Sequence, residues 1–127
     1  MFVKEWMSRG LITVAPNATL DEALKLMETN KIRRLPVVDG GKLVGIVTDR
    51  DLMKVSPSPA TTLSKYELNY ILEKIIIKDI MSKKLYTINQ NSTIEEAALI
   101  LFNEKIGGIP VVEDSGAIVG VITETDL

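Results

Sequence analysis

The chain repeats itself, and this internal duplication constrains its fold more than any other feature of the sequence. The segment from Met7 to Val38 aligns without a gap with the segment from Met81 to Val112, and many identical residues recur at matching places. One extra residue then enters a Gly-containing turn, after which residues 44–52 align with residues 119–127. Such a duplication indicates two copies of one supersecondary unit, and each copy alone is too short to bury a stable core.

Each copy has the pattern strand, helix, strand, turn, strand, followed by the start of a further helix. Thr19 and Thr93 are expected to cap the main helices, because each precedes an apolar period and has a glutamate three residues later. The β-branched runs 35–38 and 43–47 flank Asp39-Gly40-Gly41 and predict a hairpin. The proline in the first strand of each hairpin favours a sheet edge or a strand start. We expect an α/β (α+β) fold in which two strand-helix-strand-strand-helix-like repeats share one core about a pseudo-twofold.

The two copies and the segment that joins them account for the whole chain, residues 1–127, which we expect to form one domain. The predicted parts are repeat 1 at about 5–55, a connecting segment at about 56–78 and repeat 2 at about 79–127. The connecting segment begins with Ser56-Pro57-Ser58-Pro59, which is rigid and not helical. It continues as an amphipathic helix over about 64–76, because Ser64 and Glu67 form a further capping box.

Composition narrows the classes of function. The chain has no cysteine and no histidine, which removes disulfides, thiolate zinc sites, the commonest general base and the commonest transition-metal ligand. A formal net charge of -2 disfavours a broad nucleic-acid footprint. The apolar runs are too short to cross a membrane, and the N-terminus does not resemble a signal peptide. We therefore expect a cytoplasmic protein that is not an enzyme, needs no cofactor, holds no metal and binds neither nucleic acid nor membrane.

Each copy carries one of two related eight-residue strings at the end of its aligned region. Residues 45–52 read GIVTDRDL, and residues 120–127 read GVITETDL. Both strings resemble the motif of CBS domains, and their tandem arrangement resembles a CBS pair, or Bateman module. Residues 56–64, with Tyr66, Glu67, Asn69 and Tyr70, resemble more narrowly the acetoin-utilisation-type CBS proteins. The second string stops where a helix would open, which predicts that the chain belongs to a longer protein.

The resemblance implies that an adenine nucleotide (AMP, ADP or ATP) binds as a regulatory ligand in the cleft between the repeats, with S-adenosylmethionine as an alternative. In nucleotide-binding members of the family, the motif aspartate accepts hydrogen bonds from both ribose hydroxyls, and the threonine lies near the phosphates. The matching residues here are Thr48, Asp51, Thr123 and Asp126. A carboxylate has two acceptor oxygens for a vicinal diol, so this role is chemically reasonable. The same Thr-x-x-Asp spacing is also a helix capping box, so a purely structural role stays open.

Basic residues stand just before the proline of repeat 1. Family members place basic residues here against phosphates, and Arg33 and Arg34 match them, whereas repeat 2 has Gly107 and Gly108. The planar, permanently charged guanidinium suits phosphate, although a solvated surface pair is the alternative. Arg50, inside the first motif, is a weaker candidate.

Four apolar residues could flank a flat base, because ligand pockets are mostly apolar with a few polar anchors. They are Val14, Leu35, Ile88 and Ile109. The alternative for all four is that their side chains belong to the core.

The helix expected at residues 94–104 is apolar on more than one face. Leu99 and Phe102 stand where the counterpart helix at 20–30 has Lys25 and Glu28. A helix that is apolar most of the way round must be covered on a second side. CBS pairs commonly pack such helices against a second module, so we expect a homodimer whose interface includes Leu99 or Phe102; the alternative is that the connecting helix covers this face within one chain. A ligand-free dimerisation module of a larger protein is the alternative function.

Overall fold

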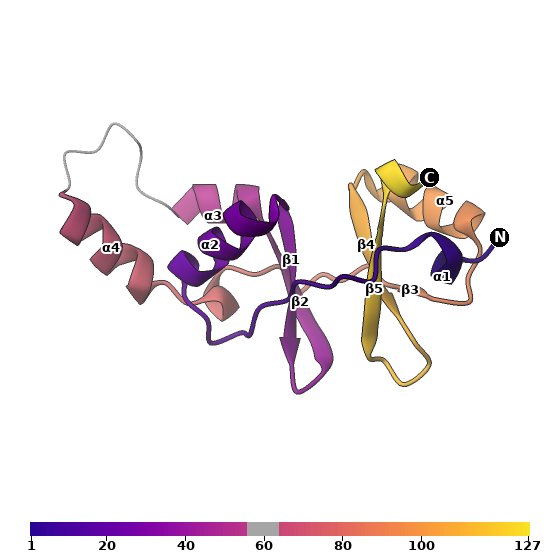
Figure 1. Cartoon of the computed structure of the whole chain (residues 1–127), viewed down its shortest axis with the longest axis horizontal. Helices are drawn as coiled ribbons and strands as arrows, with labels where there is room; N and C mark the ends of the chain where they lie inside the picture. The colour runs from indigo at the N-terminus through magenta and orange to yellow at the C-terminus, as the bar shows by residue number, and fades with distance from the viewer. Residues whose placement is uncertain (56–63) are drawn as a thin grey trace. The chain divides into compact units, whose positions relative to one another are not determined.

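The structure, a computed structural model, describes residues 1–55 and 64–127. These form two compact units whose composition does not follow the order of the sequence repeats (Figure 1). Unit 1 comprises Met1–Leu11, Gly40–Leu43 and Leu85–Leu127, and unit 2 comprises Ile12–Asp39 and Val44–Lys84. The predicted stretch Ser56–Pro59 lies outside the described residues. The predicted repeat boundaries concern the duplication in the sequence rather than the packing, and they stay a prediction.

Unit 2 contains the helices that precede and follow a hairpin and all of this hairpin except Gly40–Leu43, which belong to unit 1. Its elements are α2 (Leu20–Asn30), β1 (Arg34–Asp39), β2 (Lys42–Thr48), α3 (Asp49–Val55) and α4 (Lys65–Lys74). The hairpin between β1 and β2 is confirmed, and its turn has Gly40 at φ 58° and Gly41 at φ 83°. Two consecutive left-handed residues suit the right-handed twist of a two-stranded hairpin, and glycine adopts this conformation without steric cost. Helices α2 and α3 contact each other beside this hairpin (Figure 1).

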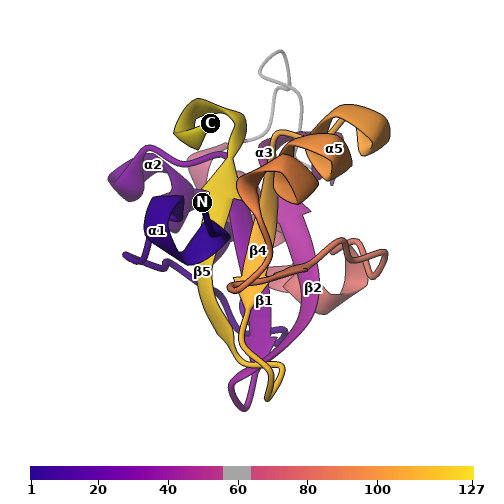
Figure 2. The same ribbon diagram turned by 90° about the vertical axis from the view of Figure 1, so that its right-hand side faces the viewer.

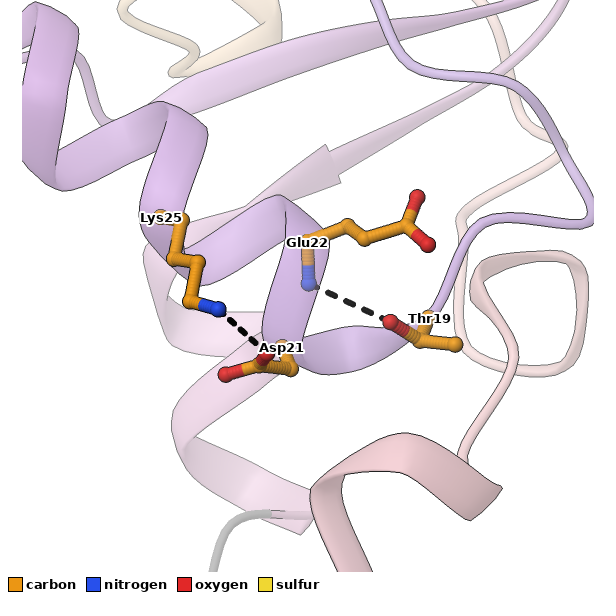
Figure 3. Close-up of polar contacts among 4 residues, drawn as sticks. All are labelled: Thr19, Asp21, Glu22 and Lys25. Carbon is orange, nitrogen blue, oxygen red and sulfur yellow. Dashed lines mark hydrogen bonds and ion pairs between the residues drawn. The ribbon is translucent and has the colours of Figure 1, made fainter. Parts of the chain in front are cut away.

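The first turn of α2 shows how the sequence fixes the start of a helix (Figure 3). The amide of Glu22 donates a hydrogen bond of 3.2 Å to the Thr19 hydroxyl oxygen, which confirms Thr19 as the N-cap. One turn on, the Lys25 ammonium lies 3.0 Å from the Asp21 carboxylate. The hydrogen bond and the charge of Asp21 raise the pKa of Lys25 above its ordinary value. The main helix of repeat 2 is capped in the same way by Thr93, as the sequence predicts.

Unit 1 is built on a three-stranded sheet in the order β3 (Ile88–Asn89), β4 (Gly108–Val112), β5 (Ile118–Thr123). Strand β4 pairs in parallel with β3 and antiparallel with β5. Helix α5 (Ile94–Glu104) contacts β4, while α1 (Val3–Trp6) contacts β5 and α5 (Figure 2). Of the two positions expected for the proline strands, a sheet edge or a strand start, the edge does not hold in repeat 2, where β4 is central and Pro110 is its third residue. Strand β3 pairs only with Val111 and Val112, beyond Pro110, so the missing N–H of the proline costs no hydrogen bond to β3.

The buried side chains form two clusters, one in each unit, in place of the single shared core that the sequence predicts. Each cluster is completed by a segment from outside its main repeat. Val3 and Met7 enter the cluster of unit 1, and Ile77, which is fully buried, enters that of unit 2. This exchange of segments explains how repeats that are too short to fold alone each obtain a core. Within the described part of the chain, no helix has the length and apolarity needed to span a membrane.

Candidate functional site

The first Thr-x-x-Asp motif lies where β2 ends and α3 begins. The amide of Thr48 donates a 2.9 Å hydrogen bond to Oδ2 of Asp51, and the amide of Asp51 donates a 3.3 Å bond to the Thr48 hydroxyl. Both side chains are half-buried. The motif is therefore a capping box, as one of the two readings of the sequence predicts. Among the described residues, no donor occupies Oδ1 of Asp51, so one carboxylate oxygen remains available.

The second motif follows β5 and has the same core geometry. The amide of Thr123 donates a 2.8 Å hydrogen bond to Oδ2 of Asp126, and both residues are half-buried. Here the helical segment is a short 3-10 turn, Glu124–Asp126, which is again closed by a capping box. The Thr123 hydroxyl also donates to Oδ2 of Asp126 at 3.2 Å and lies 2.7 Å from the Thr125 hydroxyl. Thr125, the counterpart of Arg50, is not among the predicted site residues.

The basic residues before the proline lie beside the motif of their own repeat. The amide of Asp49 donates a 2.8 Å hydrogen bond to the carbonyl oxygen of Arg33, which joins the start of β1 to the start of α3. Arg33 is exposed and Arg34 is half-buried. Arg50 is also exposed, and its amide donates to Oδ1 of Asp49 at 2.9 Å. The backbones of Arg33 and Arg50 thus meet at the first Thr–Asp motif through Asp49, whereas whether the side chains of Arg33 and Arg34 face this motif stays a prediction.

The equivalent position in repeat 2 has no basic side chain. There the amide of Glu124 donates a 3.3 Å hydrogen bond to the carbonyl oxygen of Gly107. This backbone hydrogen bond is the same in both repeats, so the two motifs differ here in the side chains that precede the proline.

The four apolar candidates are buried. Val14, Leu35, Ile88 and Ile109 are between 0% and 6% exposed and belong to the two core clusters. Their side chains therefore offer little surface to a ligand, which favours the packing role. The backbone of Val14 is occupied as well, because its amide donates to Pro36 and its carbonyl oxygen accepts from Val38. Contact between these residues and a base stays a prediction.

A hollow of about 740 Å³ lies beside the second motif, between the end of α5, the start of β4 and residues 124–127. Phe102, which is 81% exposed, and Leu127, which is 46% exposed, line it. In repeat 1 the counterpart of Leu127 is Leu52, which is fully buried on α3. Neither Thr123 nor Asp126 lines the hollow, so we do not place the ligand of the motif there. Across the described residues, no group of three or more acidic, histidine or cysteine side chains could hold a metal ion.

Two hairpin-containing repeats, each ending in a Thr–Asp capping box, are the arrangement of a tandem CBS module. The family model of the CBS domain matches residues 3–58 and 77–127. The chain belongs to the CBS domain family and carries two copies of the domain, which confirms the resemblance that the two motifs indicate.

Curated relatives include both small and large proteins. A CBS domain-containing protein of Dictyostelium discoideum is 38% identical over all of this chain and 88% of its own length. The inosine-5'-monophosphate dehydrogenase of Korarchaeum cryptofilum is 36% identical over 98% of this chain, but the match spans only 23% of the dehydrogenase. This chain therefore corresponds to one part of the larger relative.

Solved structures share the fold along the whole chain. The CBS domain pair of protein MJ0100, in complex with 5'-methylthioadenosine and S-adenosyl-L-methionine, is 31% identical over 99% of this chain and 91% of that one, with a TM-score of 0.80. CBSX2 in complex with AMP is 28% identical over 98% and 91%, with a TM-score of 0.81. An acetoin utilization protein from Vibrio cholerae is 31% identical over 99% and 86%, with a TM-score of 0.82, which confirms the narrower resemblance.

Proposed function

We propose that this CBS pair is a regulatory module that binds adenine nucleotides (AMP, ADP or ATP) through its Thr–Asp motifs. The observation that carries the proposal is the carboxylate of Asp51, which is half-buried and held by the Thr48 amide, while no donor among residues 1–55 and 64–127 binds its Oδ1. An oriented carboxylate suits the two neighbouring hydroxyls of a ribose, because both hydroxyls donate hydrogen bonds. The complexes of related CBS pairs with AMP, and with 5'-methylthioadenosine and S-adenosyl-L-methionine, support the proposal, since all three ligands contain adenosine.

The arginines around the first motif support a ligand with phosphates. The backbone of Arg33 is hydrogen-bonded to that of Asp49, two residues before Asp51. Arg33 and Arg34 therefore start from the strand end beside the candidate ribose anchor. A planar guanidinium group can bind two phosphate oxygens at once. We propose that Arg33, Arg34 and Arg50 contact the phosphates of the nucleotide.

Isothermal titration of the whole chain with AMP, ADP, ATP and adenosine tests the proposal. Asp51→Asn should weaken nucleotide binding about 10- to 100-fold, because a charge-assisted hydrogen bond to the ribose is lost. The amide oxygen of asparagine can still accept from Thr48, so the fold should persist. Asp39→Asn, an exposed change of equal charge at the end of β1, is the matched control. Binding that survives Asp51→Asn unchanged would show that Asp51 serves only as a cap.

S-adenosylmethionine is a second candidate ligand, which the complex of the MJ0100 pair favours. Its sulfonium is positively charged, so removal of the arginines should weaken the binding of a phosphate-bearing nucleotide but not that of S-adenosylmethionine. The double variant Arg33→Ala with Arg34→Ala should weaken ATP binding more than adenosine binding and should flatten its salt dependence. An equal loss for ATP and adenosine would point instead to damage to the fold.

We further propose that the module forms a homodimer through α5. Leu99 is 59% exposed and Phe102 is 81% exposed, whereas their counterparts in α2 are the charged residues Lys25 and Glu28. Apolar side chains of this size gain most when a second surface covers them. In sedimentation experiments, Phe102→Glu should give a folded monomer, and Glu28→Gln should leave the assembly unchanged. A dimer that withstands Phe102→Glu would remove this helix from the interface.

Relatives of very different length indicate how such a module is used. This chain matches 88% of the Dictyostelium protein but only 23% of the dehydrogenase. We propose that the CBS pair acts as a regulatory part, alone or joined to another domain, and that the chain itself catalyses no reaction. Its location in the cytoplasm stays a prediction.

A further inference from the structure

We propose that the two motifs take different classes of adenosine ligand. Thr48 and Asp51 bind a phosphate-bearing nucleotide, whereas Thr123 and Asp126 bind a phosphate-free adenosine derivative that is neutral or cationic. The inference rests on the proposed function and assigns a ligand class to each motif.

The part of the ligand that both motifs share is the ribose. In each repeat the threonine amide donates to Oδ2 of the aspartate, at 2.9 Å for Asp51 and 2.8 Å for Asp126. Among the described residues, Oδ1 of neither aspartate accepts a hydrogen bond from the protein. Both carboxylates are half-buried and can anchor a vicinal diol in the same way. Any selectivity must therefore come from the side chains around this anchor.

The charges around the two anchors differ. Arg50 directly precedes Asp51, and the carbonyl oxygen of Arg33, which Arg34 follows, accepts from the amide of Asp49. The counterparts of these arginines in repeat 2 are Gly107, Gly108 and Thr125. The acidic residues are present in both repeats, because Asp49 and Asp51 correspond to Glu124 and Asp126. A phosphate beside Asp126 would thus meet carboxylates that no arginine at the matching positions of repeat 2 offsets, while a neutral or cationic group meets no such repulsion.

The net charge of each unit has the same sign as the net charge of the compared side chains at its motif. In unit 2, which holds the first motif, basic residues outnumber acidic ones. In unit 1, which holds the second motif, acidic residues outnumber basic ones. Lys31 and Lys105 occupy equivalent places after α2 and α5, so they do not distinguish the two motifs.

The threonine hydroxyls provide a second, independent difference. The Thr48 hydroxyl accepts from the amide of Asp51 and, within the described residues, donates its own proton to no protein group. That proton is available to a phosphate oxygen. The Thr123 hydroxyl instead donates to Oδ2 of Asp126 and lies 2.7 Å from the hydroxyl of Thr125. Its hydrogen-bonding capacity is used inside the protein, so it has no proton left for a phosphate.

Isothermal titration with ATP and with 5'-methylthioadenosine, which carries adenosine without a phosphate, tests the assignment on the whole chain. Asp51→Asn should weaken ATP binding about 10- to 100-fold and change 5'-methylthioadenosine binding at the second motif by less than about threefold. Asp126→Asn should show the reverse pattern: it should weaken 5'-methylthioadenosine binding about 10- to 100-fold and change ATP binding by less than about threefold. Thermal unfolding without ligand is the control for both variants, because each asparagine retains an acceptor for the threonine amide.

A gain-of-function variant makes the test independent of lost stability. Thr125 is exposed, and Thr125→Arg both restores the counterpart of Arg50 and removes the hydroxyl that contacts Thr123. It should create a second ATP site whose affinity falls with salt, while Thr125→Gln, which adds no charge, should not.

The outcomes distinguish a failure of the proposed function from a failure of the assigned ligand classes. If no adenosine compound binds the wild-type chain, the proposed function fails and the ligand classes fail with it. If ATP binds but Asp51→Asn and Asp126→Asn weaken it equally, or if wild-type protein binds two ATP molecules of similar affinity, the proposed function stands and the division of ligand classes is refuted.

Discussion

Gly120 offers a sharp test of the packing between β5 and the N-terminal segment of unit 1. A Cβ atom added at this position would lie 2.7 Å from Sδ of Met7 and 2.8 Å from the carbonyl oxygen of Ser8. Ser8 is fixed there by two backbone hydrogen bonds, since its amide donates to Val121 at 2.9 Å and its carbonyl oxygen accepts from Val121 at 3.1 Å. The Ser8 backbone cannot turn aside as a side chain can, so the methyl group of Gly120→Ala must displace it.

The cost follows from the contacts that the displacement breaks. Two backbone hydrogen bonds contribute roughly 0.5–1.5 kcal/mol each, or about 1–3 kcal/mol together. Met7 is 7% exposed and belongs to the core of unit 1, so its displacement adds about 1 kcal/mol. We therefore expect Gly120→Ala to lower the free energy of unfolding by about 2–4 kcal/mol and the melting temperature by about 10 °C.

Urea denaturation followed by far-ultraviolet circular dichroism measures this loss. Gly10→Ala is the matched control, because a Cβ at Gly10 meets no atom within 4 Å and the backbone there is not left-handed. The control should change stability by less than about 0.5 kcal/mol or raise it slightly, since alanine restricts the unfolded chain. If Gly120→Ala is as stable as Gly10→Ala, the close approach of Ser8 to β5 does not hold in solution and the reasoning is refuted.

Three further substitutions test a cap, a core position and a strained backbone position by the same urea titration. Thr19→Ala should lower the free energy of unfolding by about 1 kcal/mol, because the Glu22 amide loses its acceptor, and an equal loss in Thr19→Ser would contradict this capping role. Leu52→Ala should lower it by about 2–5 kcal/mol, since Leu52 is fully buried, and a loss below about 1 kcal/mol would speak against that burial. Lys31→Gly should raise it by up to about 1 kcal/mol, because Lys31 has a φ of 54°, and a loss would show that the lysine side chain offsets the strain.

Local sequence patterns predicted the elements well, because their causes are local. Thr19, Thr93 and Ser64 each cap the helix that the capping-box pattern placed after them. The connecting helix was expected over about 64–76 and is observed as Lys65–Lys74. The exchange of segments between repeats was not predicted, because periodicity shows which residues are buried but not which repeat buries them. Val3 and Ile77 illustrate this limit, since each completes the core of a unit whose main repeat lies elsewhere in the sequence.

In the candidate site, too, local features could be predicted from the sequence and long-range contacts could not. The Thr–Asp pairs could be found from sequence because a capping box is contained in four residues. The approach of Arg33 to Asp49 joins two segments across the hairpin and became visible only in the structure. The hydroxyl contact between Thr123 and Thr125 was also missed, although alignment with Arg50 marks Thr125 as the position where the repeats differ.

The capping and binding roles of Asp51 are compatible, and together they let ligand binding stabilise the folded state. The cap uses Oδ2, and the proposed ribose contact uses Oδ1 of the same carboxylate. A bound ribose would therefore hold the group that closes the first turn of α3, next to the fully buried Leu52. A ligand at a hundred times its dissociation constant stabilises the folded state by about 2.7 kcal/mol, provided that the unfolded chain does not bind it. Because α3 starts at the anchor itself, we expect this stabilisation to appear first as slower amide exchange in Asp49–Val55, and a ligand that slows exchange elsewhere but not in α3 would separate the two roles.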